Sequence, residues 1–240
     1  MPRLIVEENA KYPDEVAVMV SFVPTFEPVQ PQEQVCEDQE PESTVILNPD
    51  DFFYIFIVDR SGSMGGDRIA VTKEAMKLFI KSLPPQSKFQ VISFGDYYAP
   101  MIIGNEGLND NPTLSYNEHT VETALTQING FDADFGGTEI YEPLCVSIDS
   151  YSTHKKETRI FLLTDGQVSN RDSVIQKALT NKDNIRVYTF GIGSGCDTDL
   201  VQRVAANGRG SCSLVGDHDD INTLKGLVIA ALAHALEPSL

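Results

Sequence analysis

Residues 52–58 have the sequence Phe-Phe-Tyr-Ile-Phe-Ile-Val, an uninterrupted run of aromatic and β-branched side chains. A strand with one solvated face alternates apolar and polar residues, so an unbroken apolar run indicates a strand buried on both faces. Sheets covered on both faces are almost always parallel, and parallel strands need long crossover connections, usually helices. We therefore expect helices and strands to alternate in the chain that follows.

The rest of the sequence shows this alternation. Helical spacing of apolar residues is found in 67–83, 117–128, 139–151, 172–179, 200–206 and 219–236. Strand patterns occupy 89–94, 159–163, 185–190 and 211–215, with a short edge strand expected at 100–103. Such an order is typical of βαβ units. We predict an α/β fold: a doubly wound, mostly parallel sheet with one short antiparallel edge strand and helices on both faces.

The first fifth of the chain has a different composition. Residues 24–51 contain five prolines and eight carboxylates but no Lys or Arg, which is typical of an extended linker. Residues 16–23 predict one strand, which must pair with the main body or with chain outside this sequence. The sequence therefore predicts three parts: a strand-containing segment 1–23, an acidic Pro-rich linker 24–51 and a domain 52–240.

Charge excludes several classes of partner. The chain has 18 basic and 35 acidic residues and a net charge of −17. Phosphate backbones and anionic lipids should repel it, and no apolar run approaches the roughly 20 residues that span a bilayer. We expect no nucleic-acid binding and no membrane insertion. The N-terminus lacks a secretory signal pattern and the chain lacks an N-glycosylation sequence, which favours a cytoplasmic location.

Three loops near the expected carboxyl edge of the sheet are rich in oxygen atoms, and ligands of doubly wound sheets bind at that edge. Asp59, Ser61 and Ser63 form a D-x-S-x-S motif, Thr138 ends a Gly-Gly-Thr turn, and Asp165 lies in a Thr-Asp-Gly turn. Mg²⁺ prefers six oxygen ligands and keeps some of its water. Because only two of these side chains are anionic, a bound ion should still attract a carboxylate from outside.

In this order and spacing, the three motifs resemble the metal-ion-dependent adhesion site (MIDAS) of a von Willebrand factor A (VWA) domain over roughly residues 50–236. The segment Phe190–Gly195 resembles the part of that family after its fifth buried strand. The sequences of residues 56–64 and 190–195 resemble those of one branch of the family, in which a VIT domain precedes the VWA domain. Inter-α-trypsin-inhibitor heavy chains and the vault poly(ADP-ribose) polymerase belong to this branch. By this resemblance, residues 1–23 would end a VIT-like domain.

The resemblance implies that the hydroxyls of Ser61, Ser63 and Thr138 bind the metal, while Asp59 and Asp165 act directly or through water. It implies Mg²⁺ as the cofactor, with Mn²⁺ or Ca²⁺ as alternatives. The function expected is a non-enzymatic, divalent-cation-dependent protein–protein interaction module whose metal coordinates an acidic residue of the partner. The acidic residues beside the Gly-Gly-Thr turn should repel that residue to some extent: Asp96, Asp132 and Asp134.

Two other functions are considered: a structural scaffold stays open, and a phosphoryl-transfer enzyme is disfavoured. A structural scaffold with a non-essential metal site is compatible with the same motifs. A Mg²⁺-dependent phosphoryl-transfer enzyme generally needs a second carboxylate two residues after the first, where this chain has Ser61. No histidine is placed as a base for the serines, and residues 191–195 lack the pattern of a dinucleotide or phosphate loop. We therefore expect no enzyme.

The remaining polar motifs predict structural roles. Arg60 is expected to make a local salt bridge or lie along the surface. The four cysteines lack zinc-ligand spacing and are expected to be buried as small apolar residues, with a Cys196–Cys212 bridge left open. The four histidines are scattered and are expected at the surface.

Overall fold

A computed structural model describes the strands 3–8 and 16–21 and the ranges 52–108, 112–151, 156–180, 183–217 and 219–236. The chain divides into two units, Met1–Thr44 and Val45–Leu240. The first contains β1 (Arg3–Glu8) and β2 (Val16–Ser21), which pair antiparallel. The strand expected near residue 16 is thus present, and it pairs with β1. The predicted linker 24–51 lies outside the described residues.

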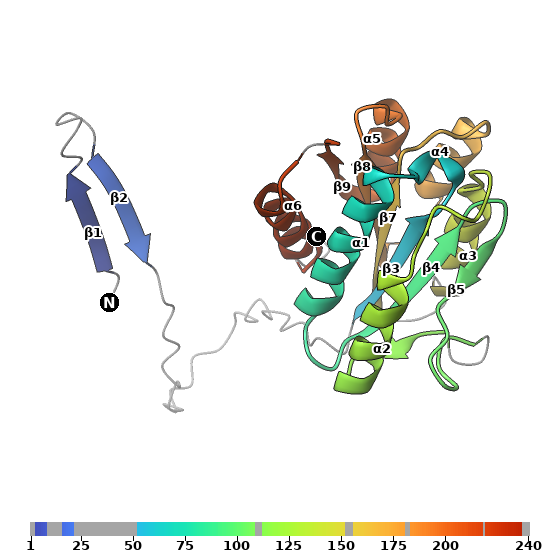
Figure 1. The fold of residues 1–240 in the computed structure, drawn as a ribbon, viewed down its shortest axis with the longest axis horizontal. Coiled ribbons are helices and arrows are strands. Elements are labelled where there is room, and N and C mark those ends of the chain that lie inside the picture. Colours follow the sequence, from blue (N-terminus) through green and yellow to red (C-terminus); the bar gives the residue numbers. More distant parts are fainter. Residues whose placement is uncertain are drawn as a thin grey trace, which may run out of the picture. The chain divides into compact units, whose positions relative to one another are not determined.

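The second unit is built on a seven-stranded sheet with the order β5-β4-β3-β7-β8-β9, and β6 also pairs with β4 (Figure 1). Its strands are β3 (Phe52–Asp59), β4 (Lys88–Phe94), β5 (Tyr98–Pro100), β6 (Leu114–Ser115), β7 (Glu157–Thr164), β8 (Ile185–Ile192) and β9 (Arg209–Val215). The strands β4, β3, β7, β8 and β9 run parallel, and β5 is the antiparallel edge. The predicted doubly wound α/β fold is confirmed.

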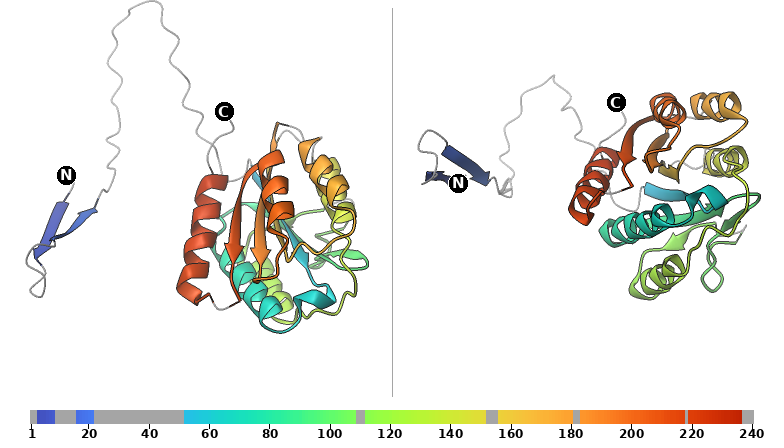
Figure 2. Two further views of the ribbon diagram at one scale, coloured as in Figure 1. Left: turned by 90° about the horizontal axis from the view of Figure 1, so that it is seen from above. Right: turned by 45° about the horizontal axis from the view of Figure 1, so that its top comes forward.

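Helices cover both faces of this sheet (Figure 2). They are a short 3-10 helix (Gly62–Met64), α1 (Asp67–Ser82), α2 (Glu118–Asn129), α3 (Tyr141–Tyr151), α4 (Arg171–Leu179), α5 (Thr198–Asn207) and α6 (Ile221–Ala235). Tyr54 and Phe56 belong to the apolar core on the face covered by α1, α2 and α6, whereas Ile55 and Ile57 belong to the core on the face covered by α3, α4 and α5. Every residue of β3 is buried, which explains its unbroken apolar sequence.

Two features of the sheet beside β4 differ from the sequence prediction. The edge strand expected at 100–103 is β5, two residues earlier, and Met101 already leaves it with its amide bonded to the Val91 carbonyl. The two-residue strand β6 also runs antiparallel to β4 and is too short for a periodic pattern. Within the described ranges, no helix is long and apolar enough to cross a membrane.

The strand order reverses at β3, because β4 lies on one side of it and β7 on the other. Ligands of doubly wound sheets bind outside the carboxyl ends of the strands at such a reversal. Asp59 is the last residue of β3, and Asp165 follows the last residue of β7. The fold therefore brings the loops after β3 and β7, which carry predicted site residues, together at the carboxyl edge of the sheet.

Candidate metal site

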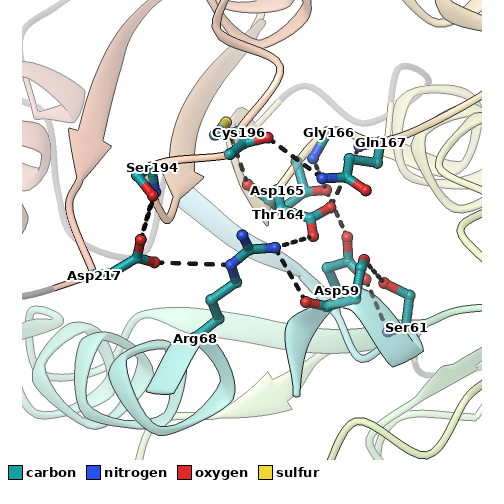
Figure 3. A network of polar contacts seen from close by, with 12 residues as sticks. Asp59, Ser61, Arg68, Thr164, Asp165, Gly166, Gln167, Ser194, Cys196 and Asp217 are labelled. Atoms are coloured by element: carbon teal, nitrogen blue, oxygen red, sulfur yellow. Dashed lines mark hydrogen bonds and ion pairs between the residues drawn. The ribbon is translucent and has the colours of Figure 1, made fainter. Parts of the chain in front are cut away.

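The first loop is organised around the carboxylate of Asp59, which is completely buried. One carboxylate oxygen accepts a hydrogen bond from the Ser61 amide at 2.8 Å, and the other accepts one from the Thr164 hydroxyl at 2.6 Å. The Ser61 and Ser63 hydroxyl oxygens lie 3.0 Å apart. Figure 3 shows Asp59 between Ser61 and Thr164. Asp59 thus joins the D-x-S-x-S loop to the end of β7.

Burying a carboxylate has an electrostatic cost at this position. Burial raises the pKa of the Asp59 carboxyl from 3.8 to about 6, while hydrogen bonds from Ser61 and Thr164 lower it. The nearby Asp165, also completely buried, adds to the rise. Two adjacent buried carboxylates favour a cation between or beside them, because a positive charge offsets their lost hydration.

The Gly-Gly-Thr turn is held against the first loop by main-chain hydrogen bonds. The Gly62 amide donates to the Gly136 carbonyl at 2.8 Å, and the Phe135 amide donates to the Arg60 carbonyl at 3.0 Å. These bonds bring Thr138, which is half-buried, to the same edge of the sheet as Ser61 and Ser63. The Thr138 position follows from the main chain, because its side chain forms no hydrogen bond with the residues that the structure describes.

Asp96 explains why two glycines precede Thr138. A Cβ at Gly136 or Gly137 would overlap the Asp96 carboxylate, and Gly136 also has a φ of +82°. The Asp96 amide in turn donates to the Phe135 carbonyl at 2.7 Å. The positive φ of Gly136 favours glycine at that position, and both glycines leave space for the exposed Asp96 carboxylate beside the turn.

Arg60 supports this turn from the other side. Its guanidinium lies 4.2 Å from the Phe135 ring centre and 4.6 Å from that of Phe131, and it pairs with Asp134 at 2.6 Å. The expected local salt bridge is confirmed. Asp134 is therefore compensated, and of the three acids expected to repel a partner, only Asp96 and Asp132 keep exposed carboxylates without an ion pair among the described residues.

Asp165 extends the site from the β7 end. Its carboxylate accepts a hydrogen bond from the Gln167 amide at 3.3 Å and another from Arg68 at 3.0 Å. Its carbonyl accepts the Asp197 amide at 2.8 Å, which ties the Thr-Asp-Gly turn to the loop before α5. Figure 3 shows Arg68 reaching this carboxylate from α1. The four residues Asp59, Ser61, Ser63 and Asp165 thus belong to one polar network.

The structure adds Thr164 and Arg68 to the residues predicted from the sequence. Thr164 stood in the Thr-Asp-Gly motif without a role, and its place at a strand end beside Asp165 was the available signal. Arg68 is visible as a basic residue in the first turn of a predicted helix. Its direction toward Asp165 depends on tertiary geometry, so no sequence pattern indicates this contact.

The donor set fits a hard divalent cation. Two oxygens about 3 Å apart, as in Ser61 and Ser63, match the edge of an octahedron with bonds of about 2.1 Å, the length typical of Mg²⁺. No group of three or more His, Cys, Asp or Glu side chains with metal-ligand geometry occurs in the described part of the chain. The candidate ligands are instead two carboxylates and three hydroxyls, which excludes a zinc-like set at this place.

The cysteines and histidines lie outside this arrangement. Cys145, Cys196 and Cys212 are free thiols and only half-buried, so the buried environment expected for them is wrong, and no Cys196–Cys212 bridge is present. His119 is exposed and His234 is partly buried. Cys36, His154 and His218 lie outside the described residues.

A family comparison decides the identity of the domain. Residues 54–214 match the family described as von Willebrand factor type A domain. The chain belongs to this family. A VWA domain-containing protein of Dictyostelium discoideum is 30% identical over 239 residues, covering 100% of this chain and 23% of the relative. VWA domain-containing protein 5A of Mus musculus is 31% identical over 179 residues, covering 71% of this chain and 22% of the relative. The chain thus spans about a quarter of the length of these relatives.

Solved structures show the same VWA fold. A von Willebrand factor type A protein from Catenulispora acidiphila superposes with a TM-score of 0.62 at 21% identity, over 77% of this chain and 42% of that chain. The manganese-loaded TRAP protein of Plasmodium vivax superposes with a TM-score of 0.57 at 19% identity, over 76% of this chain and 73% of that chain. At these identities the likeness concerns the fold.

Proposed function

We propose that this VWA domain is a divalent-cation-dependent protein–protein interaction module. In this proposal, Mg²⁺ is held by Ser61, Ser63 and Thr138 together with Asp59 and Asp165, and it coordinates an acidic residue of a partner protein. The observation that carries the proposal is the junction of three loops at one sheet edge, with two completely buried carboxylates among these side chains. VWA domains often mediate protein–protein interactions, which agrees with this function.

In this proposal, the carboxylate of Asp59 and the hydroxyls of Ser61 and Ser63 have different roles. Asp59 already accepts two hydrogen bonds, so its main role is to hold the Ser61 loop and the β7 end in register. Ser61 and Ser63 present two neighbouring hydroxyl oxygens to one point. When bound, the cation would supply a coordination position for the partner's carboxylate, because three of the five side chains are uncharged.

The surroundings of the site suggest the chemistry of the partner. Tyr97 is 58% exposed and stacks on Phe135 at 4.5 Å, so a flat aromatic surface borders the Gly-Gly-Thr turn. Asp96 lies against the same turn in space, and Asp132 and Glu139 lie close to it in the sequence; all three residues are exposed. A partner segment whose acidic residue is flanked by apolar and basic residues would use the aromatic surface and avoid repulsion.

The test is capture of partners by the immobilised protein in Mg²⁺ and in EDTA, compared among variants. Thr138→Ala removes a proposed ligand, and Thr126→Ala on the exposed side of α2 removes an equivalent hydroxyl away from the site. We expect a captured protein that is lost in EDTA and with Thr138→Ala but retained by Thr126→Ala. Capture that ignores both EDTA and Thr138→Ala would favour an assembly scaffold with a non-essential metal site.

The finer assignments are parts of the same proposal. We assign the domain to the VIT-containing branch of the family because of the sequences of residues 56–64 and 190–195. We propose a cytoplasmic location because of its composition and the free thiols of the described cysteines. We also propose that the domain is not an enzyme, on the absence of a carboxylate at position 61. Turnover of a phosphate ester that disappears in Asp59→Ala would contradict this last point.

A further inference from the structure

Arg68 brings a positive charge of the chain itself to the candidate metal site. Its guanidinium donates to the Asp165 carboxylate at 3.0 Å (Figure 3). It also donates to the Ser63 carbonyl at 3.1 Å. The Asp165 side chain is completely buried, and that of Arg68 is only 22% exposed. The pair is therefore largely shielded from water, and a charge pair in such a place is stronger than one at the surface.

The guanidinium is held on a third side by the loop that follows β9. Asp217 lies 3.7 Å from the Arg68 Nε, and its other oxygen accepts hydrogen bonds from the Ser194 amide, at 3.0 Å, and from the Ser194 hydroxyl. Arg68 thus connects α1, the end of β7 and the loop before α6. This set of contacts fixes the guanidinium in one position, whereas an exposed arginine would sample many.

Two glycines leave room for the guanidinium. A Cβ on Gly193 would stand 2.6 Å from the Arg68 Nε, and a Cβ on Gly195 would stand 3.0 Å from one of its terminal nitrogens. Gly193 also has a φ of +85°, which favours glycine in any case, whereas Gly195 has no such conformation. The glycine-rich segment after β8 is therefore shaped to admit the arginine side chain.

We propose that Arg68 is an internal cation that neutralises Asp165 in the metal-free domain and competes with the divalent ion for this carboxylate. This inference rests on the proposed metal site. A cation bound at Asp165 would stand close to a guanidinium of the same sign, so binding must either move Arg68 or overcome the repulsion. Arg68 then sets the cation affinity of the site and protects the buried carboxylate when the ion is absent.

The experiment is calorimetric titration of Mn²⁺ and Mg²⁺ into the whole chain, with melting temperatures measured in EDTA. Arg68→Gln removes the competing charge, and Arg203→Gln removes an equal charge from the exposed pair with Asp199 on α5. We expect Arg68→Gln to bind Mn²⁺ about tenfold more tightly than the wild type. The same variant should melt at a lower temperature in EDTA, and Arg203→Gln should change neither value.

A second variant keeps the charge and changes only the space. Gly195→Ala places a Cβ 3.0 Å from a terminal nitrogen of Arg68 at a position without a positive φ, so the guanidinium must shift slightly, and cation affinity should change in the same direction by a smaller factor. It carries the test if Arg68→Gln does not fold without metal. Unchanged affinity in both variants would overturn the competition, and weaker binding in Arg68→Gln would show that Arg68 supports the bound ion.

The outcome also separates this inference from the proposed function. If the wild type binds Mn²⁺ and Arg68→Gln binds it equally, the competition is wrong and the metal site stands. If only Arg68→Gln binds, the competition is right and the wild-type domain does not work as a metal-dependent module at that concentration. If no variant binds, both are wrong.

Discussion

Thr164→Val tests whether the hydroxyl of Thr164 holds the Asp59 carboxylate in the metal-free domain. The Thr164 hydroxyl donates to Asp59 at 2.6 Å and accepts the Gly166 amide at 2.9 Å, and all three residues are buried. Valine has nearly the volume of threonine, so the substitution removes these two bonds without opening a cavity. Losing them leaves a buried carboxylate and a buried amide with fewer partners.

The expected cost follows from the two lost bonds. A hydrogen bond to a charged group contributes about 1.5 to 3 kcal/mol, and an orphaned buried amide costs about 1 kcal/mol. We therefore expect Thr164→Val to lower the free energy of unfolding by about 2 to 4 kcal/mol, or the melting temperature by roughly 5 to 15 °C in a domain of this size. The direction is destabilising because Asp59 stays buried in the variant.

Urea denaturation in EDTA at about pH 8 measures this cost, with an unchanged m-value showing that the transition itself is the same. Thr72→Val is the matched control, because the buried Thr72 hydroxyl donates at 2.8 Å to the neutral Arg68 carbonyl within α1. The control should cost less than about 1 kcal/mol. Equal costs for the two variants would refute the role of Thr164 in holding Asp59.

Three further predictions concern the rest of the domain. Burial raises the pKa of Tyr54 from 10.0 to about 12, so the free energy of unfolding should fall as the pH rises from 10 to 12. When this free energy is measured by urea unfolding at each pH, Tyr54→Phe should make the fall smaller. Arg60→Met removes the pair with Asp134 and should lower stability by about 1 kcal/mol and speed amide exchange at Phe135, and unchanged exchange would contradict its support of the turn. Arg159→Met removes a buried Nε donor that lies 2.6 Å from the Ala235 carbonyl. It should lower the free energy of unfolding in urea by about 2 kcal/mol and speed amide hydrogen exchange at the end of α6.

The sheet could be predicted because each buried strand has a characteristic apolar pattern within its own short segment of sequence. The apolar run of β3 reflects burial on both faces, and the reversal of strand order at β3 follows from helices that cross over in both directions. β1 was missed because its alternation is weak, and β6 because two residues carry no period. The displacement of β5 by two residues reflects main-chain pairing with β4, which side-chain patterns do not report.

Only part of the candidate site could be predicted from the sequence. Asp59 and Asp165 could be placed together because the carboxyl ends of parallel neighbours meet at one sheet edge. The contacts of Arg68 and Thr164 could not be placed, since they depend on rotamers and on the packing of α1 against the sheet. The compensation of Asp134 by Arg60 is likewise tertiary, and it reduces the repulsion that the sequence alone suggests.

The most direct test of the proposed metal site is a crystal structure of the protein grown with Mn²⁺, with diffraction data that locate the metal by its anomalous scattering. The proposal predicts a single strong peak within coordination distance of the Ser61 and Ser63 hydroxyls, beside Thr138 and Asp165. A peak elsewhere, or no peak in saturating Mn²⁺, would contradict it.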